Sequence, residues 1–239
     1  MLLGVEEISM TQQTRIAMAA FGIVALLISA CANDPGGAPT PVAPEQPSAT
    51  EPAAETPQVE TLSNRFPNSL GVCPFMSVSN APSPVEGLKI TDYRRTVTIN
   101  SVSIATAPIA KGCLSSGFGL RNGRTHKGID LHNADPVDIY ASGAGQIREK
   151  TYRDDYGNML VIDHGGGVFT RYAHLESFAA GLRTGDRVSA GQTIGIMGNT
   201  ASYRIPRHLH YEVLTGEWGA RAGSFALTPV SIFAAMSGN

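Results

Sequence analysis

Apolar and polar residues alternate with a period of two over short stretches in the second half of the chain. In the clearest of them, Leu209–Leu214, His210 and Glu212 would face one side of a strand while Leu209, Tyr211 and Val213 face the other. Further short stretches with the length and composition of strands lie between Gly-rich turns, at Ile139–Ala141, Met159–Asp163, Val168–Leu175 and Thr193–Met197. The pattern predicts a set of short β-strands.

Helical periodicity is rare along the chain. Only Pro229–Met236 has the pattern of a short helix, and Thr96–Ala105 alternates like a single strand. The 26 glycines suit the tight turns that join short antiparallel strands. We therefore expect an all-β fold, an antiparallel β-sheet sandwich.

The beginning of the chain has the features of a targeting segment. Arg15 precedes the apolar run Ile16–Ala30, which is too short to cross a bilayer comfortably and suits the apolar region of a signal peptide. The run ends at Cys31 after small residues, and so resembles the bacterial lipoprotein box, in which this cysteine becomes lipidated. We expect residues 1–31 to be a lipoprotein signal peptide, with an ordinary signal peptide as the alternative. By the same resemblance, Ala32 favours the outer over the inner membrane.

Two regions separate this segment from the strand-rich part. Residues 32–62 hold seven prolines among Ala, Thr and Glu, without Lys or Arg. Such a stretch cannot bury enough apolar area to fold, so we expect a disordered, extended linker. Residues 63–112 are expected to form a small β-rich preface, and residues 113–236 the domain that carries the chemistry.

Cys73 and Cys113 are the remaining cysteines. In an exported protein they favour a disulfide. It would close a loop of about 40 residues and stabilise the fold by roughly 4 kcal/mol in the chain-entropy model. Two buried free thiols are the alternative. Zinc ligation by either cysteine is disfavoured because neither belongs to a C-x-x-C pair.

Composition excludes one class of partner. A net charge of −2 gives no basic footprint for nucleic acid, and an apolar content of 42% is enough to build a core.

The candidate chemistry lies in two pairings that contain histidine. His126 and Asp130 are four residues apart, and Gly128 between them argues against a helix, so both should point the same way on a strand. His208 and His210 share a strand face by the same alternation. Imidazole and carboxylate are ordinary zinc ligands, and a catalytic zinc keeps one position open beside three protein ligands. The sequence predicts an open zinc site built on strands.

Four motifs in a fixed order indicate a family. SSGFGLRNGRTHKGIDLH, TRYAHL, GDRVSAGQTIGIMGNT and RHLHYEV together resemble the lysostaphin-type, or β-lytic, zinc metalloendopeptidases over about half of the chain. The resemblance implies a hairpin-rich fold with a narrow groove, the "duplicated hybrid motif". It implies zinc ligation by His126, Asp130 and His210. It also implies catalytic roles for His174 and His208, which would orient and deprotonate water or stabilise the tetrahedral intermediate.

The resemblance implies a substrate as well. Lysostaphin-type enzymes cut peptide bridges of bacterial cell walls. With a lipid anchor and a long tether, this implies a monomer at a membrane in the periplasm, which hydrolyses peptide cross-links of peptidoglycan at the D-alanyl–diamino acid bond. Arg121 is the candidate contact for a carboxylate of the peptide stem. Alternatives are a non-catalytic regulator that activates a cell-wall amidase and a carrier module, the latter disfavoured because Gly185–Gly198 lacks Lys.

Other polar positions have weaker assignments. His164, before three glycines, is expected in a turn. His132 is expected at the surface, with a contact to a zinc ligand or a ligand role as alternatives. Val168, Thr170 and Tyr172 are expected on the strand face of His174. The loop before H-x-H lacks the Gly-rich run common in the family, a difference that bears on substrate preference.

Overall fold

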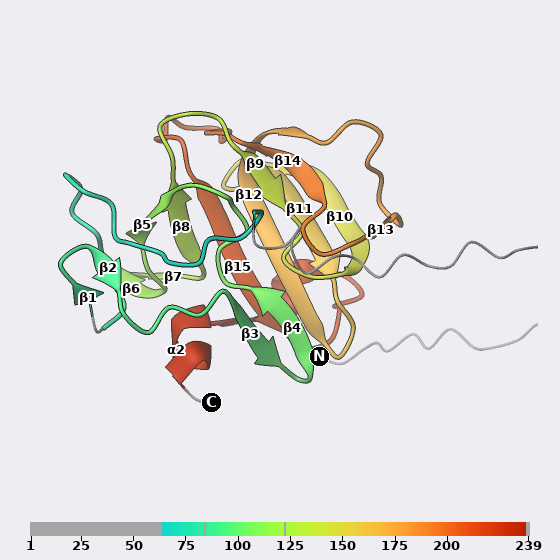
Figure 1. Ribbon diagram of the computed structural model, residues 1–239. Coiled ribbons are helices and arrows are strands. Elements are labelled where there is room, and N and C mark those ends of the chain that lie inside the picture. Colours follow the sequence, from blue (N-terminus) through green and yellow to red (C-terminus); the bar gives the residue numbers. More distant parts are fainter. Residues whose placement is uncertain (1–63, 84, 122, 238–239) are drawn as a thin grey trace, which may run out of the picture. The chain divides into compact units, whose positions relative to one another are not determined.

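A computed structural model describes residues 64–83, 85–121 and 123–237, whose regular secondary structure is almost entirely β-strand (Figure 1). The expected signal peptide, its Cys31 and the linker lie outside the described residues. None of the helices in the described part of the chain is long and apolar enough to cross a membrane. The expectation of an all-β fold is confirmed. All pairings between the strands named below are antiparallel.

The main sheet holds ten strands, with β14 and β16 joined at its middle and β9 beyond β14. Its principal order is β13-β10-β11-β12-β15-β8-β5, while β14 pairs with β12 and β9, and β16 pairs with β15. The strands are β5 (Cys113–Ser116), β8 (Ile129–His132), β9 (Asp138–Tyr140), β10 (Gly145–Arg153), β11 (Gly157–Asp163), β12 (Val168–Phe178), β13 (Arg187–Val188), β14 (Thr193–Met197), β15 (Leu209–Thr215) and β16 (Thr228–Val230).

In the part of the chain that the structure describes, three small hairpins lie outside this sheet. They are formed by β1 (Val85–Glu86) with β2 (Lys89–Ile90), β3 (Thr96–Ile99) with β4 (Val102–Ala105), and β6 (Gly119–Arg121) with β7 (Arg124–His126). Two short helices, η1 (Ser224–Ala226) and α2 (Ile232–Ser237), follow β15.

The central strands β12 and β15 carry apolar side chains on both faces. Tyr172 and Tyr211 are cross-strand partners in one buried core, and Phe169 and Leu214 are partners in a second. Burial on both faces explains why the apolar residues of Val168–Leu175 do not keep to alternate positions. A charged residue in these strands must therefore be paired inside the protein.

The expected element boundaries differ from the structure in two places. Thr96–Ala105 is a hairpin and not one strand, because Asn100 and Ser101 turn the chain with φ angles of 47° and 65°. The final helix begins at Ile232, because Pro229 belongs to β16 and pairs with Leu214 of β15. Alternation alone does not show where an extended stretch reverses, so both errors arose at turns.

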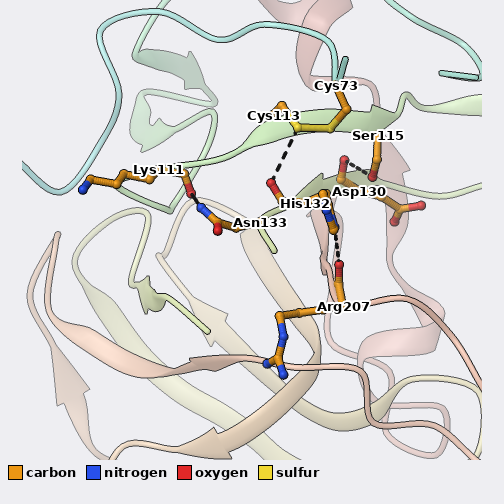
Figure 2. Close-up of a disulfide and its surroundings, with 8 residues drawn as sticks. All are labelled: Cys73, Lys111, Cys113, Ser115, Asp130, His132, Asn133 and Arg207. Atoms are coloured by element: carbon orange, nitrogen blue, oxygen red, sulfur yellow. Dashed lines mark hydrogen bonds between the residues drawn. A yellow bond between two sulfur atoms is a disulfide. The ribbon is translucent and has the colours of Figure 1, made fainter. Parts of the chain in front are cut away.

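The segment before β5 is attached to the sheet edge by backbone hydrogen bonds and a disulfide (Figure 2). Cys73 is bonded to Cys113, which confirms the expected pair. The Cys73 amide donates to the Leu114 carbonyl at 2.9 Å. Further along, the hydroxyl oxygens of Ser79 and Ser116 lie 2.8 Å apart. This segment therefore reaches the end of β5 that borders the candidate site.

Candidate metal centre and groove

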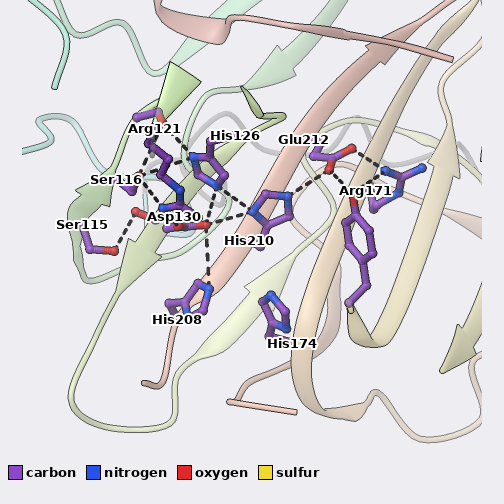
Figure 3. A network of polar contacts seen from close by, with 12 residues as sticks. Ser115, Ser116, Arg121, His126, Asp130, Arg171, His174, His208, His210 and Glu212 are labelled. Carbon is purple, nitrogen blue, oxygen red and sulfur yellow. Dashed lines mark hydrogen bonds and ion pairs between the residues drawn. The ribbon is translucent and has the colours of Figure 1, made fainter. Parts of the chain in front are cut away.

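His126, Asp130 and His210 form a buried cluster that could hold a metal ion (Figure 3). One ligand atom from each lies within 4.8 Å of the others. His126 Nε2 and His210 Nδ1 are 3.0 Å apart, and Asp130 Oδ1 lies 3.0 Å from the first and 2.9 Å from the second. Asp130 and His210 are cross-strand partners on β8 and β15, so the sheet register sets their approach.

His126 and Asp130 do not share a strand, contrary to the expectation from their spacing. β7 ends at His126 and β8 begins at Ile129. A Cβ atom on Gly128 would lie 2.3 Å from the Tyr211 carbonyl oxygen, so glycine is required where the chain passes β15. The two ligands converge because the chain changes direction at this glycine.

His208 and His174 lie beside the cluster. His208 immediately precedes β15, and its Nε2 is 3.8 Å from Asp130 Oδ1. The ring centroids of His174 and His208 are 4.7 Å apart, and those of His174 and His210 are 6.0 Å apart. All the histidines that the sequence assigned to the site are thus together, although their roles stay a prediction.

His174 faces away from the neighbours that alternation assigned to it. Regular alternation would place it with Tyr172 in the core. Its φ angle of 63° and an extra residue in β12 opposite Asn158–Leu160 of β11 turn it to the His210 side instead. A non-glycine residue in this backbone region costs roughly 1–3 kcal/mol, and such residues cluster at functional sites.

The outward-facing ring nitrogens of three site histidines have backbone partners. Because a carbonyl oxygen can only accept, each such nitrogen carries the proton, and the other nitrogen is directed to the site. The pairs are His126 Nδ1 with Gly117 O at 2.7 Å, His174 Nδ1 with Thr200 O at 2.8 Å and His208 Nδ1 with Pro206 O at 2.8 Å.

Burial and neighbouring charges shift the pKa values of the ionisable side chains at this site. Burial, with a smaller effect of neighbouring His208, lowers the pKa of His174 to about 4, and burial also lowers the pKa of His208. Both side chains are therefore neutral at pH 7 and can accept a proton. Burial opposes ionisation of Asp130 as well, but its close contacts with the His126 and His210 rings hold its pKa well below the ordinary value.

Arg121, the expected substrate contact, is already engaged with the cluster. Its Nη1 donates to Asp130 Oδ2 at 3.1 Å and to Ser116 Oγ at 2.8 Å. The side chain is still 40% exposed. It therefore lines the groove and holds the second oxygen of Asp130.

The cluster forms the floor of a groove of about 650 Å³. Met76 and Ser79 of the N-terminal segment line it, as does the loop from Tyr203 to Arg207. Two further hollows share residues with the groove: Arg121 and Arg124 line one, and Arg204 and Arg207 line the other. The sequence reasoning missed Arg124 and Arg204, because nothing local shows that two distant loops border the same groove.

The remaining two histidines lie outside the metal cluster. His132 Nδ1 donates to the Arg207 carbonyl at 2.6 Å, and so ties the groove loop to β8. His164 donates through Nδ1 to Ala144 O at 2.8 Å, and its Nε2 lies 2.7 Å from Thr170 Oγ1. Both are tethers within the fold.

Two buried charges behind His210 had no role in the sequence analysis. Arg171 is 1% exposed and forms an ion pair with Glu212, which is fully buried. The available signal was a charged residue among the mainly apolar residues in the middle of each of two strands, β12 and β15.

Residues 124–221 match the model of Peptidase family M23. Curated relatives include the DD-carboxypeptidase/endopeptidase Mpg of Neisseria meningitidis, 35% identical over 52% of this chain and 28% of the relative. The peptidoglycan DD-endopeptidase ShyC of Vibrio cholerae is 37% identical over 38% of this chain and 20% of the relative. The outer membrane antigenic lipoprotein B of Histophilus somni is 32% identical over 49% of this chain and 36% of the relative.

The matched stretch contains His126, Asp130 and His210 of the cluster and both neighbouring histidines. The chain spans about a fifth to a third of the length of these relatives. The motif order, the all-β fold and the family match agree, so residues 124–221 form a Peptidase family M23 domain, of the lysostaphin type that the sequence motifs indicate.

Proposed function

We propose that this protein is a zinc-dependent endopeptidase that hydrolyses peptide cross-links of peptidoglycan. The observation that carries the proposal is the cluster of His126, Asp130 and His210 on the floor of a groove. Two imidazoles and one carboxylate fit zinc, and three protein ligands leave the open position of a catalytic site. In each of the three side chains, the polar atom that faces away from the cluster is held by a hydrogen bond: Asp130 Oδ2 by Arg121, His126 Nδ1 by Gly117 O and His210 Nε2 by Glu212. The side chains therefore need little reorganisation to bind an ion.

When bound, zinc supplies Lewis-acid activation of water and of the scissile carbonyl. His174 and His208 supply the proton transfers. Each is neutral near pH 7, each donates its Nδ1–H to a carbonyl, and each keeps Nε2 free to accept a proton. One would take the proton of the attacking water on Nε2 and return it to the leaving amine, while the other would accept a hydrogen bond from the water and orient it.

The proposed bond joins D-alanine of one stem to the side-chain amine of the diamino acid in the next. Relatives carry names that specify DD-endopeptidase activity, which supports this bond over a glycine bridge. The arginines along the groove support an acidic peptide as substrate. Arg124 and Arg204 are exposed and line hollows that adjoin the groove, so they can pair with carboxylates of two stems. Arg121 is proposed as a third contact.

The proposed location is the periplasm, with a lipid on Cys31 as the anchor and the outer membrane as the favoured site. Support comes from the lipoprotein-like motif and from a relative named as an outer membrane lipoprotein. The test is cell fractionation with metabolic lipid labelling. Cys31→Ser should lose the label and leave the membrane fraction, whereas continued labelling would exclude Cys31 as the lipid site.

The activity is tested by incubating the full-length chain, purified in detergent, with cross-linked dimeric muropeptides and following the products by mass. Two monomers per dimer support the proposal, and a chelator should abolish their formation. Intact dimers with cleaved sugar–peptide amide bonds would identify an amidase instead. Intact dimers with activation of an added cell-wall amidase would identify a regulator.

A further inference from the structure

His210 differs from the other histidines of the site in the partner of its outward-facing nitrogen. His126, His174 and His208 donate to neutral backbone carbonyls. His210 Nε2 lies 2.9 Å from Glu212 Oε1. The Glu212 carboxylate is fully buried and forms an ion pair with the Arg171 guanidinium. Glu212 is therefore an acceptor, and His210 carries its proton on Nε2.

The carboxylate of Glu212 is held from two further sides. Tyr156 donates its hydroxyl to Oε1 at 2.9 Å, and Arg171 pairs with Oε2 from the opposite strand. Arg171 is itself fixed by a hydrogen bond from Nη2 to Ser224 O at 2.9 Å and by the Phe225 ring, 4.2 Å from its guanidinium carbon. Figure 3 shows Glu212 between the His210 ring and the Arg171 side chain.

Stability alone does not account for two fully buried charges in the middle of a sheet. Desolvation costs several kcal/mol for each ion, and replacing a buried ion pair by apolar residues is often neutral or stabilising. Arg171 and Glu212 are cross-strand partners on the central strands β12 and β15. The ion pair instead holds the Glu212 carboxylate in a fixed position behind His210, where it accepts a hydrogen bond from the ring.

We infer that Glu212 is a positioning residue for metal binding: its anchored carboxylate fixes the ring and tautomer of His210, so that the Nδ1 lone pair is directed to Asp130 and His126. Arg171 and Tyr156 act through Glu212 by holding it in place. The inference rests on the proposed metal site. A carboxylate behind a ligating imidazole orients the ring and raises the basicity of the ligating nitrogen, and its loss typically weakens metal binding by about 10–100-fold.

The test separates a structural role from a positioning role by removing both charges together. The full-length double variant Arg171→Met with Glu212→Leu keeps an apolar, well-filled core but has no acceptor for His210. Zinc dissociation constants are measured by competition with a chelator, and cooperative melting of the zinc-free proteins reports the fold. We expect cooperative melting with zinc binding weakened about 10–100-fold. A wild-type dissociation constant in this variant would overturn the inference.

A second pair of substitutions tests for rescue. Arg171→Met with Glu212→Gln is equally free of charge but retains a carbonyl that can accept the Nε2–H, so it should bind zinc more tightly than the Leu variant. Equal affinities would exclude the hydrogen bond as the cause. If the Leu variant does not melt cooperatively, Glu212→Gln alone decides: weaker zinc binding at a wild-type melting temperature supports the role, and unchanged binding overturns it.

The matched control is Glu176→Gln, a change of the same type at a carboxylate that is 53% exposed on β12. It should leave the zinc dissociation constant unchanged. Failure of the inference is distinguishable from failure of the proposed function, because a wild-type protein that binds no zinc would refute the metal site itself. A wild-type protein that binds zinc, with a Leu variant that binds it equally well, would refute only the role of Glu212.

Discussion

The rings of His174 and His208 lie 4.7 Å apart, centroid to centroid, and the two residues reach the groove by different routes. His208 arrives at the start of β15, whereas His174 arrives through a left-handed residue in the middle of β12. Each is oriented by a single backbone carbonyl. The two imidazoles therefore present free nitrogens to one space beside the proposed metal.

Replacing either of these histidines should separate metal binding from turnover. His174→Ala and His208→Ala are expected to keep about one zinc per chain, because neither belongs to the three-ligand cluster. Turnover of dimeric muropeptides should fall by about 10²–10⁴-fold, the usual contribution of a general acid or base. Near-wild-type cleavage by one variant would assign that residue a structural role.

Removing a proposed ligand should have the opposite effect on metal content. His210→Ala is expected to lose most of the zinc, because a two-ligand remnant of His126 and Asp130 no longer closes around the ion. Elemental analysis after dialysis measures the loss. His132→Ala is the matched control and should retain zinc, since His132 lies outside the cluster. Stoichiometric zinc in His210→Ala would refute the ligand set.

The exposed arginines should affect substrate binding more than the chemical step. Arg124→Gln and Arg204→Gln are each expected to raise KM by about 2–5-fold, in line with exposed ion pairs worth under about 1 kcal/mol, while kcat changes little. The effect should shrink as salt is added. Arg183→Gln, at an exposed arginine outside the groove, is the control. A fall in kcat at constant KM would contradict a role in binding.

The disulfide should contribute measurably to stability. Cys73 and Cys113 are 40 residues apart, and cross-links of that span are worth roughly 4 kcal/mol in the chain-entropy model. The double variant Cys73→Ser with Cys113→Ser should therefore unfold at a lower urea concentration. Mass spectrometry of non-reduced digests of wild-type protein should show the linked peptides. Free thiols at both positions in periplasmic protein would contradict the bond.

His164 should make stability depend on pH below neutrality. Burial lowers its pKa in the folded protein from the ordinary 6.5, although a bond to Ala144 and the charge of Asp163 act the other way. Between the folded and unfolded pKa values the unfolded chain binds more protons, so stability rises with pH there. The contribution is present above pH 6.5 and is lost as pH falls through the folded pKa. His164→Gln should have a flatter profile of unfolding free energy in this window, and an unchanged slope would assign the pH dependence to other groups.

The sequence by itself determined the residue types of the site and the class of fold. The alternation in Leu209–Leu214 placed His210 and Glu212 on one strand face, and the structure confirms that they contact each other there. Alternation is a local property of extended backbone, so it can be read without knowing the partner strands. The disulfide could also be predicted from the sequence, because only Cys73 and Cys113 remained once Cys31 was assigned to the lipoprotein-like motif.

The tertiary structure decided the features that depend on distant segments. His174 left the face that alternation gave it, Gly128 separated His126 from Asp130, and Arg121 contacted Asp130. A bulge, a close backbone approach and an ion pair are each set by the neighbouring strand, and sequence spacing contains no information about that neighbour. The same reason hid the pairing of Arg171 with Glu212, because cross-strand register is fixed only when β12 and β15 meet in the sheet.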